Sequence, residues 1–416
     1  MSLFFLVSRY LRSRMMNTFL NIFLLGLGVA AITIMLLANI QLQQKISNNA
    51  RGIDLVIGAK GSPMQLILSS IFHADVPTGN IKLRDAERFA SGPLIRQAIP
   101  LALGDNYRGF RIVGTSKNYS ELYGARLADG KWWSRNMDVT LGSAVAARTG
   151  LKTGDHFSSA HGLTSEGHAH ERPYQVTGVM LATGSILDDL ILTNVGSIWE
   201  VHDLWTPNDQ INAADSNALA MRSPIIPDVL RGDSIKEITS LLIRYRSALG
   251  AVQLPRVVNS NSSLQAASPA FETARLFSII GTGADLLLAF AYLIIVIAAV
   301  SIFIALYNSL RERRYDMAIM RAMGAGKSRL FLMVVLEGTL LSFLGCVLGL
   351  VLGHLALTGI AFWLEPTSKA GITGFYFHAV ELLLLAASMV LGILCAIVPA
   401  IEAYRTDISD VLAGNR

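Results

Sequence analysis

The chain has 416 residues, of which 52% are hydrophobic and only 16% are charged. This composition excludes a purely soluble enzyme, and the length is too great for one small domain. The net charge of +5 does not indicate a nucleic-acid partner, because the basic residues cluster beside apolar stretches. Both cysteines, Cys346 and Cys395, also lie in apolar stretches, so disulfides do not reveal the compartment.

The N-terminal segment, residues 1–17, mixes apolar residues with Arg9, Arg12 and Arg14. This mixture is typical of a helix that lies along the inner membrane interface, although a basic flank that only sets topology would read the same way. The apolar core that follows is longer than that of a usual signal peptide. Because no small-residue cleavage pattern comes after it, we expect a retained membrane anchor.

Three further apolar stretches reach the roughly 20 residues that a helix needs to cross the hydrocarbon core. Only helices and closed barrels satisfy every backbone group in lipid. The sequence therefore predicts a membrane protein with four transmembrane helices, at 18–40, 284–307, 330–357 and 379–401.

The distribution of Lys and Arg predicts the orientation of these helices. Eleven such residues lie in the N-terminal segment, in the 308–329 loop and in the 402–416 tail, whereas the 358–378 loop holds only Lys369. Both termini are therefore expected in the cytoplasm, with residues 45–280 outside.

Residues 45–280 are predicted to form an α+β domain inserted between the first two spans. Apolar and β-branched runs predict strands at 54–58, 110–114, 174–180 and 238–245. Runs with helical periodicity alternate with them at 63–72, 84–90, 194–203 and 265–283. The last of these leads directly to the second span, so we expect it to transmit motion.

Four of the eight histidines lie within fifteen residues of this domain: His156, His161, His168 and His170. Histidine and the neighbouring carboxylates are ligands that zinc prefers. The spacing is not that of a closed zinc site, and the flanking glycines favour a flexible solvated loop. Zinc binding is therefore kept as a secondary hypothesis for these four residues.

In the third span, Gly345, Gly349 and Gly353 recur at every fourth residue. Small residues at this spacing let another helix approach closely in lipid. We therefore expect a helix contact, either within one chain or between two. His354, beside these glycines, is expected to be a packed polar residue rather than a transport site.

The 308–329 loop contains a short amphipathic segment that is predicted to form a helix ending at Gly324. Such a helix can lay an apolar face into the groove of a partner. Its apolar positions are Met317, Ile319, Met320 and Met323.

A Gly-Lys-Ser triplet begins at Gly326, but it is not a phosphate loop. The glycine that such a loop requires five positions earlier is Arg321. We therefore expect this chain to bind no nucleotide or other cofactor, with zinc as the one secondary hypothesis.

The run from Glu312 to Ala325, a basic and acidic stretch followed by an apolar helix and a Gly-Ala turn, resembles the signature of FtsX-like and MacB-like ABC transporter permeases. The Leu336-Glu337-Gly338 segment, the end of the chain and the overall layout are also similar to that family. The resemblance implies a coupling helix that docks onto an ATPase, with the residues Asp316, Met317, Ile319, Met320, Arg321, Met323 and Gly324.

The resemblance also implies partners and a location. It implies a separate ABC ATPase subunit that binds ATP and Mg, a second permease copy that completes a homodimer or heterodimer, and contact with membrane lipid. It implies the inner membrane of a bacterium, and a periplasmic domain with a βαβ part next to the membrane and a β-rich insertion at about 100–230. A periplasmic adaptor and an outer-membrane protein are further expected partners.

Two functions are consistent with these observations, and neither is an enzyme activity of the chain itself. The first is a permease subunit that couples ATP hydrolysis by its partner to movement of the periplasmic domain, for efflux or extraction of an envelope substrate. The second is a non-transporting signal transmitter that regulates a periplasmic enzyme such as a cell-wall hydrolase. A metal-handling receptor is a third hypothesis, which rests only on the histidines.

Overall fold

The computed structural model describes residues 3–161, 172–201, 236–364 and 373–405. The chain divides into two compact units. A helical unit comprises residues 1–43 and 279–416, and an α+β domain comprises residues 44–278.

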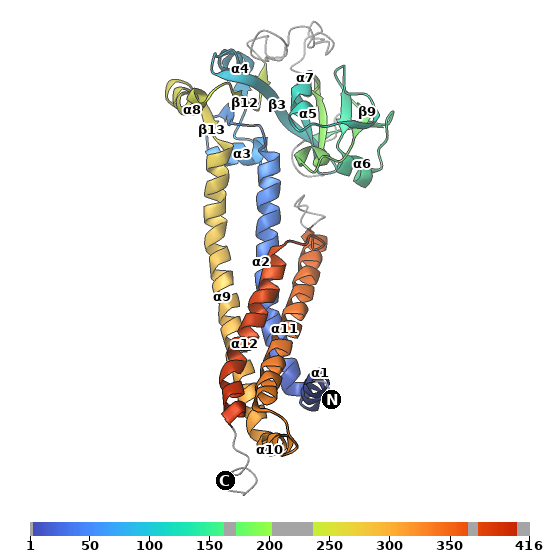
Figure 1. The fold of residues 1–416 in the computed structure, drawn as a ribbon. Coiled ribbons are helices and arrows are strands. Elements are labelled where there is room, and N and C mark those ends of the chain that lie inside the picture. Colours follow the sequence, from blue (N-terminus) through green and yellow to red (C-terminus); the bar gives the residue numbers. More distant parts are fainter. Residues whose placement is uncertain (1–2, 162–171, 202–235, 365–372, 406–416) are drawn as a thin grey trace. The chain divides into compact units, whose positions relative to one another are not determined.

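Among the described residues, the helical unit contains four helices that are long and apolar enough to cross a membrane. They are α2 (Met15–Asn49), α9 (Pro269–Glu312), α11 (Lys327–Leu364) and α12 (Val380–Arg405). Two shorter helices, α1 (Leu3–Ser13) and α10 (Arg314–Ala322), accompany them (Figure 1). The α+β domain is inserted between α2 and α9, which confirms the fold class expected from the sequence.

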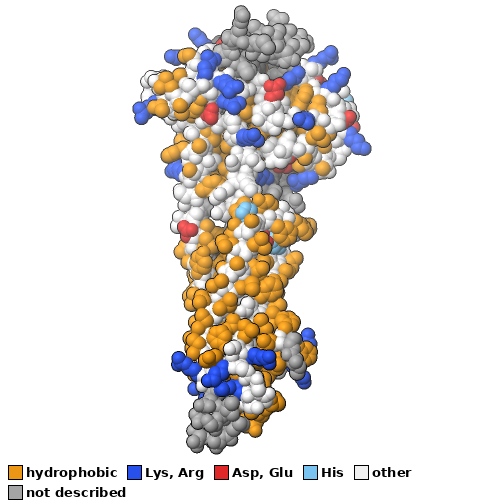
Figure 2. Space-filling model, in the orientation of Figure 1, with side chains coloured by type: hydrophobic (Ala, Val, Ile, Leu, Met, Phe, Trp, Pro, Cys, Tyr) orange, Lys and Arg blue, Asp and Glu red, His pale blue; other side chains and the backbone are white. Residues whose placement is uncertain are grey.

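Residues of every long helix contribute to one core of the helical unit. The core includes Leu25 and Val29 of α2, Ile302 of α9, Leu341 of α11 and Ala396 of α12. Large apolar side chains instead cover the outside, and Figure 2 shows them along the visible face, with Lys and Arg gathered at the end that carries α1 and α10. This distribution suits a bundle that faces lipid and has one basic end.

Helix α1 buries Val7 and Leu11 in that core and exposes Phe4 and Phe5. Exposed aromatic residues next to arginines are typical of a helix that lies at a membrane interface. The interfacial position remains a prediction.

The α+β domain is built on one mixed sheet with the strand order β13-β1-β12-β3-β4-β10-β6-β9-β5. Most neighbouring strands are antiparallel, but the pairs β4–β10 and β6–β9 are parallel. The strands along this path are β1 (Leu55–Ala59), β3 (Ile95–Tyr107), β4 (Phe110–Thr115), β5 (Leu127–Gly130), β6 (Asp138–Leu141), β9 (Tyr174–Met180), β10 (Leu190–Asn194), β12 (Ser240–Tyr245) and β13 (Leu264–Ala267).

Two short strands also belong to this sheet: β7 (His156–Phe157) pairs with β9, and β8 (Ala160–His161) pairs with β3. In a separate two-stranded sheet, β2 (Ile81–Lys82) pairs with β11 (Glu237–Ile238).

Both faces of the sheet are covered, which explains why its central strands are apolar at consecutive positions. In β12, Leu241 and Ile243 point to one hydrophobic cluster and Leu242 to the other. The first cluster includes residues of α4 (Leu83–Ala90), α6 (Ser143–Thr149), α7 (Val195–Val201) and α8 (Ala248–Asn261). The second includes residues of α3 (Pro63–Ser70), α5 (Lys117–Leu122) and the 3-10 helix Ile186–Asp189.

The helix expected at 265–283 is wrong in its first residues. Leu264–Ala267 form β13, whose Ala267 pairs with Val56 of β1, and α9 begins only at Pro269. The strand is stabilised by hydrogen bonds to a segment some 200 residues away, so local periodicity does not reveal it. Proline at the first helical position then suits the start of α9.

The βαβ part that the resemblance implied is a split unit. Strands β1 and β3 are both antiparallel to β12, so they run in the same direction with β12 between them. Because β3 extends from Ile95 to Tyr107, one strand crosses the boundary expected near residue 100. The inserted part therefore continues the same sheet.

Candidate coupling site

Helix α10 ends where the sequence predicts, because Gly324 adopts a left-handed conformation with φ of 97°. The Ala325 N–H donates to the Met320 carbonyl at 2.9 Å, and the Gly324 N–H donates to the Arg321 carbonyl at 3.0 Å. These bonds satisfy carbonyls at the helix end, and glycine supplies the backbone conformation without steric cost.

One side of α10 is buried against its own chain. Met317 is only 2% exposed and packs with Leu310, Val334 and Ala403 from α9, α11 and α12, while Met320 is half-buried beside them. The expectation that the methionines together form a partner-facing surface is therefore wrong for Met317. This residue is part of the core of the helical unit.

The opposite side of α10 is exposed. Tyr315 and Met323 are 59% and 76% exposed, Asp316 is exposed and Ile319 is half-buried. Positions 315, 319 and 323 are four residues apart and thus follow one helix face. We call these four residues the docking surface: Tyr315, Asp316, Ile319 and Met323. Of the other residues implied for coupling, Arg321 is half-buried and Gly324 forms the helix end.

The first turn of α10 is anchored by Arg313, which precedes it. One guanidinium nitrogen of Arg313 lies 3.4 Å from a carboxylate oxygen of Glu337 in α11, and both side chains are almost completely buried. The guanidinium also stacks over the Tyr10 ring of α1, 3.9 Å from the ring centre. Arg313 thus connects the start of α10 to two other helices.

Two further ion pairs surround this anchor. Arg14, just before α2, pairs with Glu312, and Arg314 pairs with Glu402 of α12. These side chains are more exposed, so each pair contributes no more than about 1 kcal/mol. The three contacts thus join Glu312, Arg313 and Arg314, at the start of α10, to the rest of the helical unit.

Sequence reasoning did not identify Tyr10 or the Arg313–Glu337 pair. The available signal was Glu337, which lies at the start of an apolar span and 24 residues after Arg313 in an arginine-rich segment. A buried carboxylate in such a position requires a cationic partner.

The structure places the three glycines of α11 against α2 of the same chain. A Cβ atom would lie 2.9 Å from the Leu25 side chain at Gly345, 2.6 Å from the Val29 side chain at Gly349 and 2.9 Å from the Thr33 side chain at Gly353. On another side of α11, a Cβ at Gly338 would lie 2.7 Å from the Gly392 carbonyl of α12. Small residues thus allow α11 to approach two helices closely.

Of the four histidines, the structure describes only His156 and His161, and it does not bring them together with other ligands at one site. His156 is exposed on β7, and His161 lies on β8 opposite Asp105 in the strand register. His168 and His170 lie outside the described residues. Within the described ranges, no three histidine, cysteine or carboxylate side chains are close enough to hold a metal ion.

Two family models match the chain. The MacB-like periplasmic core domain matches residues 18–222, and the FtsX-like permease C-terminal region matches residues 288–408. No curated protein matches the sequence.

Two solved structures are similar to parts of the chain. The periplasmic region of MacB from Actinobacillus actinomycetemcomitans is 16% identical, with 56% of this chain and 98% of that chain covered and a TM-score of 0.33. The extracellular domain of the noncanonic ABC-type transporter YknZ from Gram-positive bacteria is 11% identical, with 51% and 98% covered and a TM-score of 0.30. The assignment rests on the family models, which together match most of the chain: it belongs to the family of FtsX-like and MacB-like permeases.

Proposed function

We propose that this chain is the permease subunit of an ABC complex in which a separate ATPase subunit docks on α10. ATP hydrolysis by that subunit would move the periplasmic domain for export or extraction of an envelope substrate. The observation that carries the proposal is the pair of faces on α10, one buried in the permease and one apolar and exposed.

An exposed apolar face on an otherwise anchored helix suits a protein partner. Aromatic and methionine side chains are enriched where proteins bind one another, and Tyr315 and Met323 supply them on the docking surface. Met317 and Met320, on the other side of α10, pack instead in the chain's own core. A partner would therefore complete the burial of this helix.

The anchor explains how a force on α10 would reach the membrane helices. Separating the buried charges of Arg313 and Glu337 costs about 3–5 kcal/mol, which is the typical cost of breaking a buried ion pair. Arg313 therefore holds the start of α10 to α11 and α1. A displacement of α10 by its partner would move these helices with it.

Two spans continue beyond the length that a membrane requires. Helices α2 and α9 have 35 and 44 residues, and at about 1.5 Å per residue each exceeds the roughly 30 Å hydrocarbon core. Their far ends belong to the α+β domain. Unbroken helices of this kind would transmit movement from the membrane to that domain.

The proposal includes the expected arrangement in the cell. Both termini and α10 would lie in the cytoplasm of a bacterium, the four spans in its inner membrane and the α+β domain in the periplasm. A second permease copy, identical or not, would complete the membrane part, with a periplasmic adaptor and an outer-membrane protein as additional partners.

Purification of the full chain from its native host, followed by identification of bound subunits and an ATPase assay, tests the proposal. The variant Met323→Glu places a charge in the docking surface, so we expect at least about 30-fold weaker ATPase binding, as for the loss of a strong interface contact. Met16→Glu is the matched control, because Met16 is an 81% exposed methionine outside the docking surface.

Equal ATPase binding by both variants would show that the ATPase does not dock on this face of α10. Recovery of no ATPase with the intact chain would exclude the complex altogether. If an ATPase binds and a cell-wall hydrolase is recovered without transported cargo, the signal transmitter is the better description of the same coupling.

A further inference from the structure

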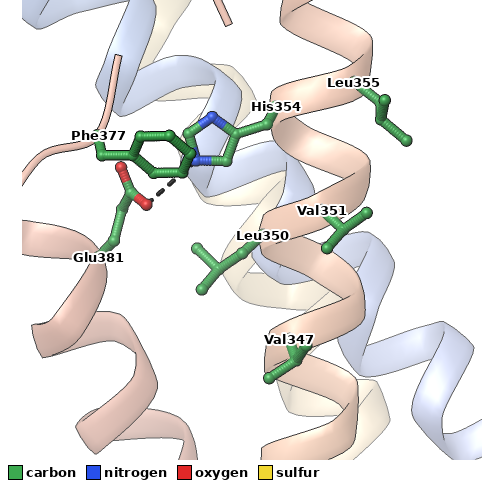
Figure 3. Close-up of a pocket in the computed structure, with 7 residues that line it drawn as sticks. All are labelled: Val347, Leu350, Val351, His354, Leu355, Phe377 and Glu381. Carbon is green, nitrogen blue, oxygen red and sulfur yellow. Dashed lines mark hydrogen bonds and ion pairs between the residues drawn. The ribbon is translucent and has the colours of Figure 1, made fainter. Parts of the chain in front are cut away.

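The helical unit has a cavity of about 350 Å³ beside the end of α11 that leads into the 358–378 connection. Its walls include Val347, Leu350 and Val351 of α11 and Phe377 of the connection, as Figure 3 shows. A volume of this size falls in the range of small-molecule sites, about 300–1,000 Å³. The lining residues of α11 lie in its second half, whereas α10 precedes the start of α11 at Lys327.

A polar pair closes one end of the cavity. Nε2 of His354 lies 3.1 Å from a carboxylate oxygen of Glu381, the first-turn residue of α12 (Figure 3). Nδ1 of His354 donates to the Gly374 carbonyl at 2.5 Å, since a carbonyl can only accept. The second carboxylate oxygen accepts the His378 N–H at 2.9 Å.

This pair determines where Phe377 lies. His354 attaches Gly374 and Glu381 to α11, and Glu381 in turn holds the His378 backbone. The Phe377 ring lies 4.6 Å from the imidazole, centre to centre. Phe377 is nevertheless 72% exposed, because its other face borders the cavity. The pair thus holds an aromatic wall over an apolar groove.

The groove does not have the character of a helix–helix interface. Helices associate in lipid through small residues, and those of α11 already face α2 and α12 at Gly345, Gly349 and Gly338. The groove instead presents branched and aromatic side chains on a helix that must lie in the bilayer. Its natural occupant is therefore a flexible apolar chain rather than another helix.

We propose that this groove binds one acyl chain of a bilayer phospholipid, in the leaflet on the side of the 358–378 connection. The chain would lie along Val347 and Val351 with Phe377 across it, and the His354–Glu381 pair would mark the depth at which the lipid becomes polar. The proposal requires only that α11 and α12 span the membrane. It therefore stands or falls independently of the ATPase complex.

The test uses the full chain in nanodiscs that contain phosphatidylcholine with a photoreactive diazirine on one acyl chain. After illumination, labelled residues are identified by mass spectrometry of peptides. We expect labelling of residues 347–355 and 375–382 to exceed that of the exposed α9 face, around Leu286 and Val300, by about fivefold per residue.

Two variants and a control connect this labelling to the groove. Val351→Trp fills the groove and Phe377→Ala removes its wall, so each should lower labelling of residues 347–355 about fivefold. Val390→Trp is the matched control, because Val390 on α12 is 55% exposed and Val351 is 49% exposed, but Val390 does not line the cavity. The control should label like the unmodified chain.

Equal labelling of the groove and the α9 face would show ordinary surrounding lipid and would overturn the proposal. Weak labelling of residues 347–355 in the unmodified chain, together with a dimer that dissociates in the Val351→Trp variant, would also overturn the proposal. A second copy of the chain would then occupy the groove. Phe377 is exposed, so its replacement keeps the test valid even where Val351→Trp fails to fold.

Discussion

Gly349 offers a direct test of how the membrane helices pack. A Cβ atom at this position would lie 2.6 Å from the Val29 Cβ and 2.7 Å from the Gly26 carbonyl oxygen of α2. Carbon atoms in ordinary contact are about 3.5–4.0 Å apart, so Gly349→Ala must move α2 and α11 apart by about 1 Å. Val29 is buried and Gly26 contributes a backbone atom, so neither can rotate away.

The magnitude follows from two opposing effects. Forcing an additional methyl group into a tight contact costs about 1–3 kcal/mol, whereas replacing glycine by alanine within a helix gains about 1 kcal/mol. Gly359→Ala in the same helix is the matched control, because its Cβ would meet nothing within 4 Å. Gly349→Ala should therefore be less stable than Gly359→Ala by about 1–3 kcal/mol.

The assay is unfolding of both variants by SDS in mixed micelles, followed by tryptophan fluorescence and circular dichroism. The helical propensity gain is common to the two variants, so their difference reports the contact with α2 alone. Equal stability of the two variants would refute the reasoning, because the glycines of α11 would then face lipid or a flexible neighbour.

Arg313→Ala should destabilise the helical unit by about 3–5 kcal/mol by leaving the buried Glu337 carboxylate unpaired, and a further Glu337→Gln change should restore most of that loss in the same SDS assay. Burial raises the pKa of Tyr174 well above its usual value, so the stability that this residue contributes is present at neutral pH and is lost as pH rises above about 10, where the unfolded chain ionises. Tyr174→Phe should therefore flatten the loss of stability between about pH 10 and 12, and an unchanged pH profile in thermal unfolding would contradict this. The secondary metal hypothesis predicts that zinc titration of the full chain shows binding that competes with a chelating dye and that alanine at His156, His161, His168 and His170 abolishes it, and no binding above that of the buffer would end this hypothesis.

The two faces of α10 show where prediction from sequence reached its limit. The pattern of apolar residues predicted the helix and its end at Gly324, because both depend on local spacing and on a backbone conformation that glycine adopts easily. It could not distinguish Met317, which is buried in the chain, from Met323, which is exposed. A helix between its own protein and a partner is apolar on both sides, so composition alone does not assign either side.

Sequence by itself determined the four spans, the position of the inserted α+β domain and the family. Each of these depends on the length of an apolar run or on a motif of neighbouring residues, which a chain displays before it folds. Only the tertiary structure decided that the glycines of α11 meet α2, that β12 separates β1 from β3 and that Arg313 pairs with Glu337. These contacts join residues that are distant along the chain. Their energies depend on distances and burial that exist only once the helices and strands have packed together.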